Sequence, residues 1–240
     1  MTAQRPFRLG MIVPSSNTCL EPQTYRILGD RTDVTVHSAR TEVTRIGLDQ
    51  DSDRQFDVSA MRGAGELLAT AKVDAIAWNG TSGSWLGIEH DREITAAITD
   101  ATGIRATTSS LALLELLRRH DLGRIALLTP YTDDVNDSVA AVYDAHGIEV
   151  TSSVGWSLSD NEAFAGVAPD ELLEPSRKLL REKPDALVYL CTNLYGAPVV
   201  APLEAEFGIP VLDSVAVTLW HSLVLAGAPL LDPRWGSLLS

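Results

Sequence analysis

The chain has 240 residues, of which 45% are hydrophobic and 21% charged, and its formal net charge is −13. This composition is ordinary for a globular protein, and the length allows one large domain or two small ones. The negative charge argues against a nucleic-acid-binding or anionic-membrane surface, although a local site can still bind an anionic small molecule.

The remaining totals favour a cytoplasmic protein. No stretch approaches the roughly 18 uninterrupted apolar residues of a membrane span. The first residues show no apolar segment or cleavage site of a secretion signal. The two cysteines lie far apart and do not form a disulfide framework. We therefore expect a reducing compartment and no membrane partner, and the sequence indicates no oligomeric state.

The first half of the chain alternates predicted strands and helices. Short apolar runs predict strands over residues 8–14, 34–38, 74–78 and 104–108. Helices are expected from about Glu21, over 53–70 and over 89–102. In the second of these helices, the apolar positions at helical spacing are Phe56, Met61, Leu67 and Leu68. Residues 41–50 have weak periodicity and predict a mobile loop.

The same alternation then begins again. The pattern predicts strands over 124–130, 149–153, 185–190 and 209–214. The helices are expected over 109–120, 134–146, 168–182, 198–207 and 215–226.

Three pairs of segments match at a spacing of roughly 110 residues and indicate an internal repeat. They are RLGMIVPSSN with RIALLTPYTD, VDAIAWNGTSG with PDALVYLCTNLYG, and TGIRATTSSLALL with FGIPVLDSVAVTL. We predict an α/β fold of two pseudo-symmetric halves, each a short parallel sheet flanked by helices, with the active site in the cleft between them. The first half is expected to contain 1–108 and 215–240, and the second 109–214. The alternative is two unrelated α/β domains with similar patterning.

Cys191 is the first candidate for chemistry. The segment DALVYLCTNLYG reads as a buried strand that brings this cysteine to its carboxyl end, where ligands of open α/β sheets bind. A thiol there can act as an acid, a base or a nucleophile. The alternative is a small core residue, because free cysteines are often buried.

The loops at the equivalent strand ends are polar. Residues 80–84, GTSGS, offer hydroxyl and N–H donors around two glycines and are typical of an anion cradle, although a plain flexible turn has the same composition. In the second half, the Tyr131 phenol could donate to a carboxylate, whereas Asp133 and Asp134 are expected to cap a helix. Neither a phosphate-binding nor a dinucleotide-binding glycine motif is present.

No metal or cofactor site is expected. The five histidines are scattered, and none forms a cluster with cysteine or the i, i+4 spacing of metal ligands. No G-x-S-x-G motif predicts a hydrolase nucleophile. Cys19 follows the first strand loop and is interpreted as a packing residue.

These motifs resemble the aspartate/glutamate racemase superfamily over nearly the whole chain. IVPSSNT, residues 12–18, is similar to the opening of maleate cis–trans isomerases. WNGTSGSW (78–85), PYTDDVN (130–136) and LCTN (190–193) look more like arylmalonate decarboxylases. The resemblance implies cofactor-independent chemistry on a small carboxylic acid.

The resemblance also assigns roles to residues. Racemases and isomerases of this superfamily carry one cysteine per half, whereas the decarboxylases have a glycine in one half, as at Gly80, and a cysteine in the other, as at Cys191. The resemblance implies that Thr81 and Tyr131 donate hydroxyls, and Ser82 and Thr192 backbone N–H groups, to a retained carboxylate. The departing carboxylate should lie in an apolar pocket, and Cys191 should protonate the carbanion as a neutral thiol. The residues expected to bind substrate are Pro14, Ser15, Asn17, Asn79, Gly80, Ser82, Gly83, Thr192 and Asn193.

Three functions follow from this pattern. The leading prediction is a decarboxylase of a substituted malonate-type diacid. The second is an isomerase or racemase of a small dicarboxylic or amino acid that uses a single cysteine. The third is a non-catalytic protein that binds small acids. Asn79, Gly83 and Asn161 depart from the apolar residues of the decarboxylase pocket, so a more polar or differently shaped acid than an aryl malonate is expected.

Overall fold

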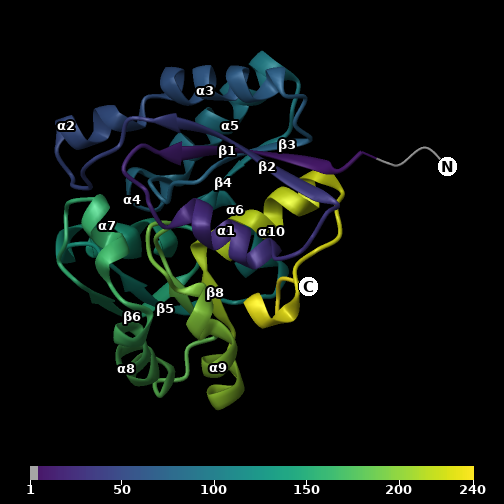
Figure 1. The fold of residues 1–240 in the computed structure, drawn as a ribbon. Helices are drawn as coiled ribbons and strands as arrows, with labels where there is room; N and C mark the ends of the chain where they lie inside the picture. Colours follow the sequence, from purple (N-terminus) through teal and green to yellow (C-terminus); the bar gives the residue numbers. More distant parts are fainter. Residues whose placement is uncertain (1–4) are drawn as a thin grey trace.

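Two parallel four-stranded sheets with the same strand order form the fold (Figure 1). The computed structural model describes residues 5–240. The first sheet has the order β2-β1-β3-β4 and the second β6-β5-β7-β8, and every pairing is parallel. The strands are β1 (Phe7–Pro14), β2 (Val34–Thr41), β3 (Ala75–Trp78), β4 (Ala106–Thr108), β5 (Arg124–Thr129), β6 (Glu149–Gly155), β7 (Ala186–Tyr189) and β8 (Val211–Asp213). The shared order confirms the predicted repeat and fold class.

Helices flank both sheets, and Figure 1 shows the first sheet above the second. The α-helices are α1 (Leu20–Leu28), α2 (Gln50–Asp53), α3 (Val58–Thr70), α4 (Gly83–Leu86), α5 (Ile88–Thr102), α6 (Ser109–Arg119), α7 (Asp133–Asp144), α8 (Pro169–Leu180), α9 (Ala197–Phe207) and α10 (Ser214–Ala226). Short 3-10 helices are η1 (Arg54–Phe56), η2 (Glu162–Gly166) and η3 (Pro233–Trp235). In the described residues, no helix has the length and apolar character needed to span a membrane.

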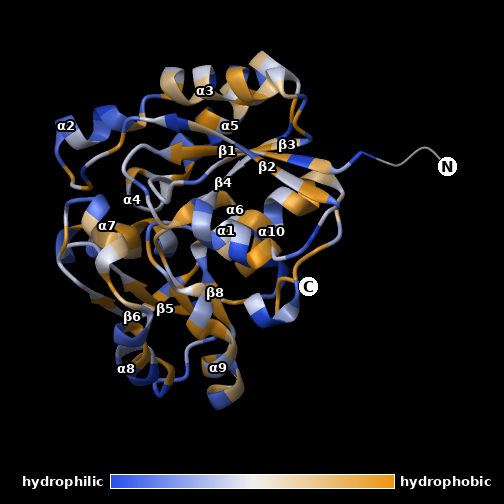
Figure 2. Ribbon diagram, in the orientation of Figure 1, coloured by the Kyte–Doolittle hydropathy of each residue, from blue (hydrophilic) through white to orange (hydrophobic). Residues whose placement is uncertain are grey.

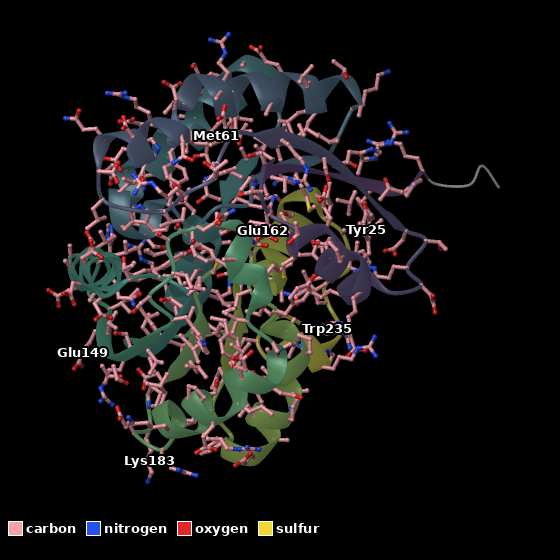
Figure 3. The ribbon with its side chains drawn as sticks, turned by 60° about the vertical axis from the view of Figure 1, so that its left-hand side comes forward. Tyr25, Met61, Glu149, Glu162, Lys183 and Trp235 are labelled. Atoms are coloured by element: carbon pink, nitrogen blue, oxygen red, sulfur yellow. The ribbon has the colours of Figure 1, made fainter. Side chains whose placement is uncertain are left out.

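The central strands are buried on both faces, which explains their continuous apolar sequence. All residues of β3 and β7 are buried, and Figure 2 shows hydrophobic colouring along the inner strands. Parallel sheets covered by helices on both faces require this pattern, whereas a half-exposed sheet would show alternation. Figure 3 shows Met61 in one half and Glu149 and Lys183 in the other.

Helices α6 and α10 follow the last strand of each sheet and pack against each other. A hydrogen bond of 2.8 Å joins the Thr218 and Ser109 hydroxyls across this contact. Helix α10 also contacts strands β1, β3 and β4 of the first sheet. We keep the division into 1–108 with 215–240 and 109–214 as a proposal; residues 1–4 lie outside the described residues.

Several local predictions were incorrect. The helix expected over 53–70 is broken at Asp57, which caps α3 through its side chain, and Leu67 is 69% exposed. The pattern placed Leu67 on the apolar face because Leu68 beside it belongs to the core. Strand β2 runs to Thr41 and α2 begins at Gln50, which leaves a loop over 42–49. The mobility of that loop stays a prediction. Helix α4 was missed because four residues show no periodicity.

Candidate active site

A small cavity lies at the carboxyl ends of the strands, and residues of both halves line it. Its volume is about 20 Å³, which is close to the space that one water molecule needs. Its lining contains no charged side chain among the described residues. The lining residues are Pro14, Val43, Ile46, Phe56, Trp78, Gly80, Thr81, Trp85, Tyr131, Asn161, Cys191 and Thr192. A bound carboxylate would therefore meet only neutral hydrogen-bond donors and apolar surface.

Cys191 follows β7, as the sequence predicts, and its thiol lines this cavity. The side chain is 3% exposed, and its sulfur accepts a hydrogen bond of 3.3 Å from the N–H of Asn193. Burial raises the pKa of the Cys191 thiol to about 12, and the hydrogen bond from Asn193 opposes this only in part. The group is therefore a neutral thiol at physiological pH, which suits a proton donor better than a nucleophile.

Thr81 and Tyr131, two residues of the predicted cradle, line the same cavity as Cys191. The Thr81 hydroxyl and the Tyr131 phenol lie 2.7 Å apart, and both residues are buried. Burial raises the pKa of Tyr131 well above its usual range, so the phenol keeps its proton. Within residues 5–240, the N–H groups of Ser82 and Thr192 donate to no other group. Because one of the two hydroxyls donates to the other, one hydroxyl proton and the two N–H groups remain available for an oxyanion. Their role stays a prediction.

Gly80 lies at the position equivalent to Cys191, and no side chain fits there. A Cβ atom on Gly80 would lie 2.4 Å from Cε2 and Cζ2 of Trp78 and 2.7 Å from its Nε1. The Trp78 ring is fully buried and donates from Nε1 to the Ser82 hydroxyl at 3.3 Å. The indole thus occupies the space that a first thiol would need.

Other predicted binding residues lie behind the cavity. The Asn17 carboxamide oxygen accepts the N–H groups of Cys19 and Leu20 at 3.0 and 2.8 Å, and its nitrogen donates to the Thr192 hydroxyl at 3.2 Å. That hydroxyl donates to the Asn79 carbonyl at 2.8 Å. This network joins the two halves and supports the cavity wall.

Four further predicted residues also lie outside the cavity lining. Ser15 binds the backbone of Val43, whereas Asn193 accepts the N–H groups of Thr18 and Cys19. Gly83 packs against the carboxyl of Asp91, and the Ser82 hydroxyl accepts a hydrogen bond from Trp78 Nε1. Direct substrate contact by the side chains of Asn17, Asn79, Ser15 and Asn193 stays a prediction.

Cys19 behaves as a packing residue. It is fully buried at the start of α1 and is not part of the cavity lining. Burial raises the pKa of its thiol.

Two contacts close the cavity from outside. Residues 42–49 bridge to the second half through a β-bridge between Arg45 and Asp160. The N–H of Ile46 donates to the Ser159 carbonyl at 2.9 Å, and the N–H of Asn161 donates to the Thr44 carbonyl at 3.0 Å. Val43 and Ile46 of this loop form part of the cavity wall.

Sequence analysis predicted an apolar pocket but did not name most of the residues that form it. Phe56, Trp78, Trp85 and Tyr131 form a chain of edge-to-face contacts with ring centroids 5.3 to 6.5 Å apart. Val43 and Ile46 come from the closing loop. Trp78 and Trp85 at and after the end of β3 were the available signal, but the direction of their side chains depends on tertiary packing.

Two buried carboxyls support the strand-end loops. Asp91 accepts a hydrogen bond from the Thr108 hydroxyl and lies against Gly83, whereas Asp213 caps α10 through the N–H of Ala216 at 2.9 Å. Burial raises the pKa of each to about 7. In the described part of the chain, no three His, Cys, Asp or Glu residues are grouped to hold a metal ion.

Comparisons with known proteins agree with this arrangement. The family model for arylmalonate decarboxylase matches residues 9–239. A maleate isomerase of Geobacillus stearothermophilus is 30% identical over 98% of this chain and 97% of its own length. The arylmalonate decarboxylase of Bordetella bronchiseptica is 28% identical over 91% of this chain and 90% of its own. A mutant Nocardia farcinica maleate cis–trans isomerase, solved with a covalently bound succinylcysteine intermediate, is 25% identical, covers 97% of each chain and superposes with a TM-score of 0.87.

Proposed function

The chain belongs to the arylmalonate decarboxylase family, and from that membership we propose that it is a cofactor-independent decarboxylase of a malonate-type diacid. In this proposal Cys191 acts alone as the proton donor. The retained carboxylate binds at Thr81, Tyr131 and the free N–H groups of Ser82 and Thr192.

The observation that carries this proposal is the filled space at Gly80. A racemase that acts on both faces of a carbanion needs an acid or base on each face. Here the Trp78 indole excludes a side chain at Gly80, so Cys191 faces the cavity without a partner from the first half. Decarboxylation needs only one protonation, because loss of CO2 itself generates the carbanion.

The reaction balances with the residues present. The bond between the α-carbon and the departing carboxylate breaks, and its electron pair passes into the retained carboxylate to give an enediolate. The donors around that group stabilise the added charge, and one such donor contributes roughly 3 kcal/mol to transition-state binding. The Cys191 S–H then transfers its proton to the α-carbon, and solvent returns a proton to the thiolate.

The cavity lining also favours release of CO2. No cation lines the site among the described residues, and the apolar wall of Val43, Ile46 and Phe56 cannot hydrogen-bond a second carboxylate. A carboxylate beside that wall is destabilised, whereas neutral CO2 is not.

Isomerisation is the second candidate, and the comparisons support it better than the decarboxylase. Four of five curated relatives are maleate isomerases, between 26% and 30% identical to this chain. A cysteine of the Nocardia farcinica enzyme carries a succinyl group, and Cys191 would have to act as a similar nucleophile here. Its raised pKa and the filled space at Gly80 are the features of this chain that favour decarboxylation instead.

Parallel incubation with maleate and with phenyl-, methyl- and hydroxymalonate, followed by NMR, tests the proposal. We expect CO2 and the corresponding monoacid from at least one malonate and no fumarate from maleate. Fumarate without CO2 would replace the decarboxylase with an isomerase. Binding without turnover of any acid would favour a non-catalytic small-acid binding protein.

A further inference from the structure

Two polar atoms of cavity-lining residues have no partner within the protein. Trp85 is only 6% exposed, and its indole Nε1 is buried and makes no hydrogen bond within residues 5–240. The carboxamide oxygen of Asn161 likewise has no described partner, and Asn161 is 5% exposed. A buried donor left unpaired destabilises the protein, which applies to Trp85 Nε1. The Asn161 oxygen is an acceptor that no protein group occupies, so both atoms are suited to a ligand.

The hydrogen bonds around Asn161 fix the orientation of its amide. The Ser16 hydroxyl donates its single proton to the Val43 carbonyl at 2.6 Å. Ser16 can therefore only accept from Asn161, whose Nδ2 lies 2.8 Å from the Ser16 oxygen. The Asn161 backbone is also held, through its N–H to Thr44 and its carbonyl to the Asn193 amide. The remaining group, Oδ1, is an acceptor.

Packing fixes the orientation of the Trp85 indole. Its ring meets Phe56 edge-on at 5.8 Å and Tyr131 at 5.3 Å, with interplanar angles of 80° and 64°. The indole N–H can only donate. It therefore complements Asn161, whose free oxygen can only accept.

We propose that Trp85 and Asn161 bind a hydroxyl group on the substituent of the substrate, with Trp85 donating to its oxygen and Asn161 accepting its proton. The inference rests on the proposed function and deepens it by naming the substrate class, a hydroxyl-bearing malonate-type diacid. A carboxylate would satisfy Trp85 but repel the Asn161 oxygen. An ammonium group would satisfy Asn161 but offer nothing to Trp85, and a hydrocarbon substituent would leave both atoms unpaired.

A small polar substituent agrees with the small size of the site. The cavity is about 20 Å³, and a hydroxyl group adds far less volume to a bound diacid than an aryl ring does. This agrees with the polar departures at Asn79 and Asn161 that the sequence shows.

Hydroxymalonate and methylmalonate form a matched pair of probes, because a hydroxyl and a methyl group have similar size. Their affinities for the Cys191→Ala protein, measured by calorimetry, test recognition without turnover. We expect hydroxymalonate to bind about tenfold more tightly, the value of one to two hydrogen bonds. Equal affinities, or a preference for methylmalonate, would overturn the inference.

Variants separate hydrogen bonding from packing. Trp85→Phe keeps an aromatic ring without the N–H, and Asn161→Ala removes the acceptor. Each of these two single variants should reduce the preference for hydroxymalonate several-fold. Trp235→Phe is the control, because Trp235 also has an unpartnered buried Nε1 but lies in η3 near the C-terminus and does not line the cavity (Figure 3). If Trp85→Phe weakened the binding of hydroxymalonate and of methylmalonate equally, Trp85 would have only a packing role, which would contradict the inference.

The same probes distinguish this inference from the proposed function. Preferential binding of hydroxymalonate with no CO2 release from any malonate by the wild-type protein would refute the decarboxylase and retain the hydroxyl site. CO2 release from methylmalonate with the same kcat/KM as from hydroxymalonate would retain the decarboxylase and refute the hydroxyl site.

Discussion

Substitution of Gly80 by alanine tests the steric basis of the single-thiol site. The added Cβ would lie 2.4 Å from two atoms of the Trp78 ring, whereas carbon atoms pack at about 3.5–4.0 Å. The ring must therefore move by about 1 Å or more, but it is fully buried and held edge-on by Phe56. Overpacking of this kind costs about 1–3 kcal/mol, which for a chain of this length lowers the Tm by roughly 2–12 °C.

Thermal and urea unfolding followed by circular dichroism measure this cost. Gly63→Ala is the matched control, because a Cβ on Gly63 meets no atom within 4 Å and the residue lies inside helix α3. That control should stabilise the protein by about 0.4–1 kcal/mol. In a Trp78→Phe background, which removes the second ring, Gly80→Ala should cost less.

The steric argument fails if Gly80→Ala is as stable as Gly63→Ala. It also fails if the cost of Gly80→Ala is unchanged when Trp78 is replaced, because the two residues would then not be coupled.

Three further predictions concern the cradle, the thiol and the buried acids. Tyr131→Phe should lower kcat by about a hundredfold. Tyr143→Phe removes a phenol that is bound to Ser84 outside the cavity, so it should change kcat little. Similar losses of kcat in both variants would contradict the cradle. In the native protein at about pH 8, iodoacetamide should modify Cys191 at least about a hundredfold more slowly than a free thiol, because burial raises its pKa; rapid labelling seen by mass spectrometry would indicate a nucleophilic thiolate. Because burial raises the pKa of Asp91 to about 7, its contribution to the free energy of unfolding is complete below about pH 4 and is lost as pH rises toward 7. Between these pH values, the Tm of Asp91→Asn should therefore fall less than the wild-type Tm. Parallel plots of Tm against pH for the two proteins would refute the burial of Asp91 as a neutral acid.

The repeat made the fold predictable from sequence. Apolar runs ending in PSSN, NGTSG and CTN recur in one order, and parallel topology then brings their carboxyl ends together. Cys191, Thr81 and Tyr131 could be assigned to one site because each directly follows such a run. Position relative to a strand end is local information that the sequence carries.

The rest of the site depends on side-chain direction and on contacts between distant segments. Gly80 stands two residues after Trp78, but only the folded loop shows that the indole turns back into the space beside it. Val43 and Ile46 lie in a loop without periodicity and reach the cavity because their segment pairs with residues near Asp160. The free oxygen of Asn161 follows from a hydrogen bond to Ser16, 145 residues away, which no local pattern predicts.

The most direct test of the central claim compares CO2 release by Cys191→Ala and Cys19→Ala. Both remove one buried thiol, but only Cys191 lines the cavity. With a malonate that the wild-type protein decarboxylates, Cys191→Ala should lose at least about a hundredfold in kcat, whereas Cys19→Ala should stay within a few-fold of wild type, with folding of both checked by circular dichroism. CO2 release by Cys191→Ala at the wild-type rate would contradict the assignment of Cys191 as the proton donor.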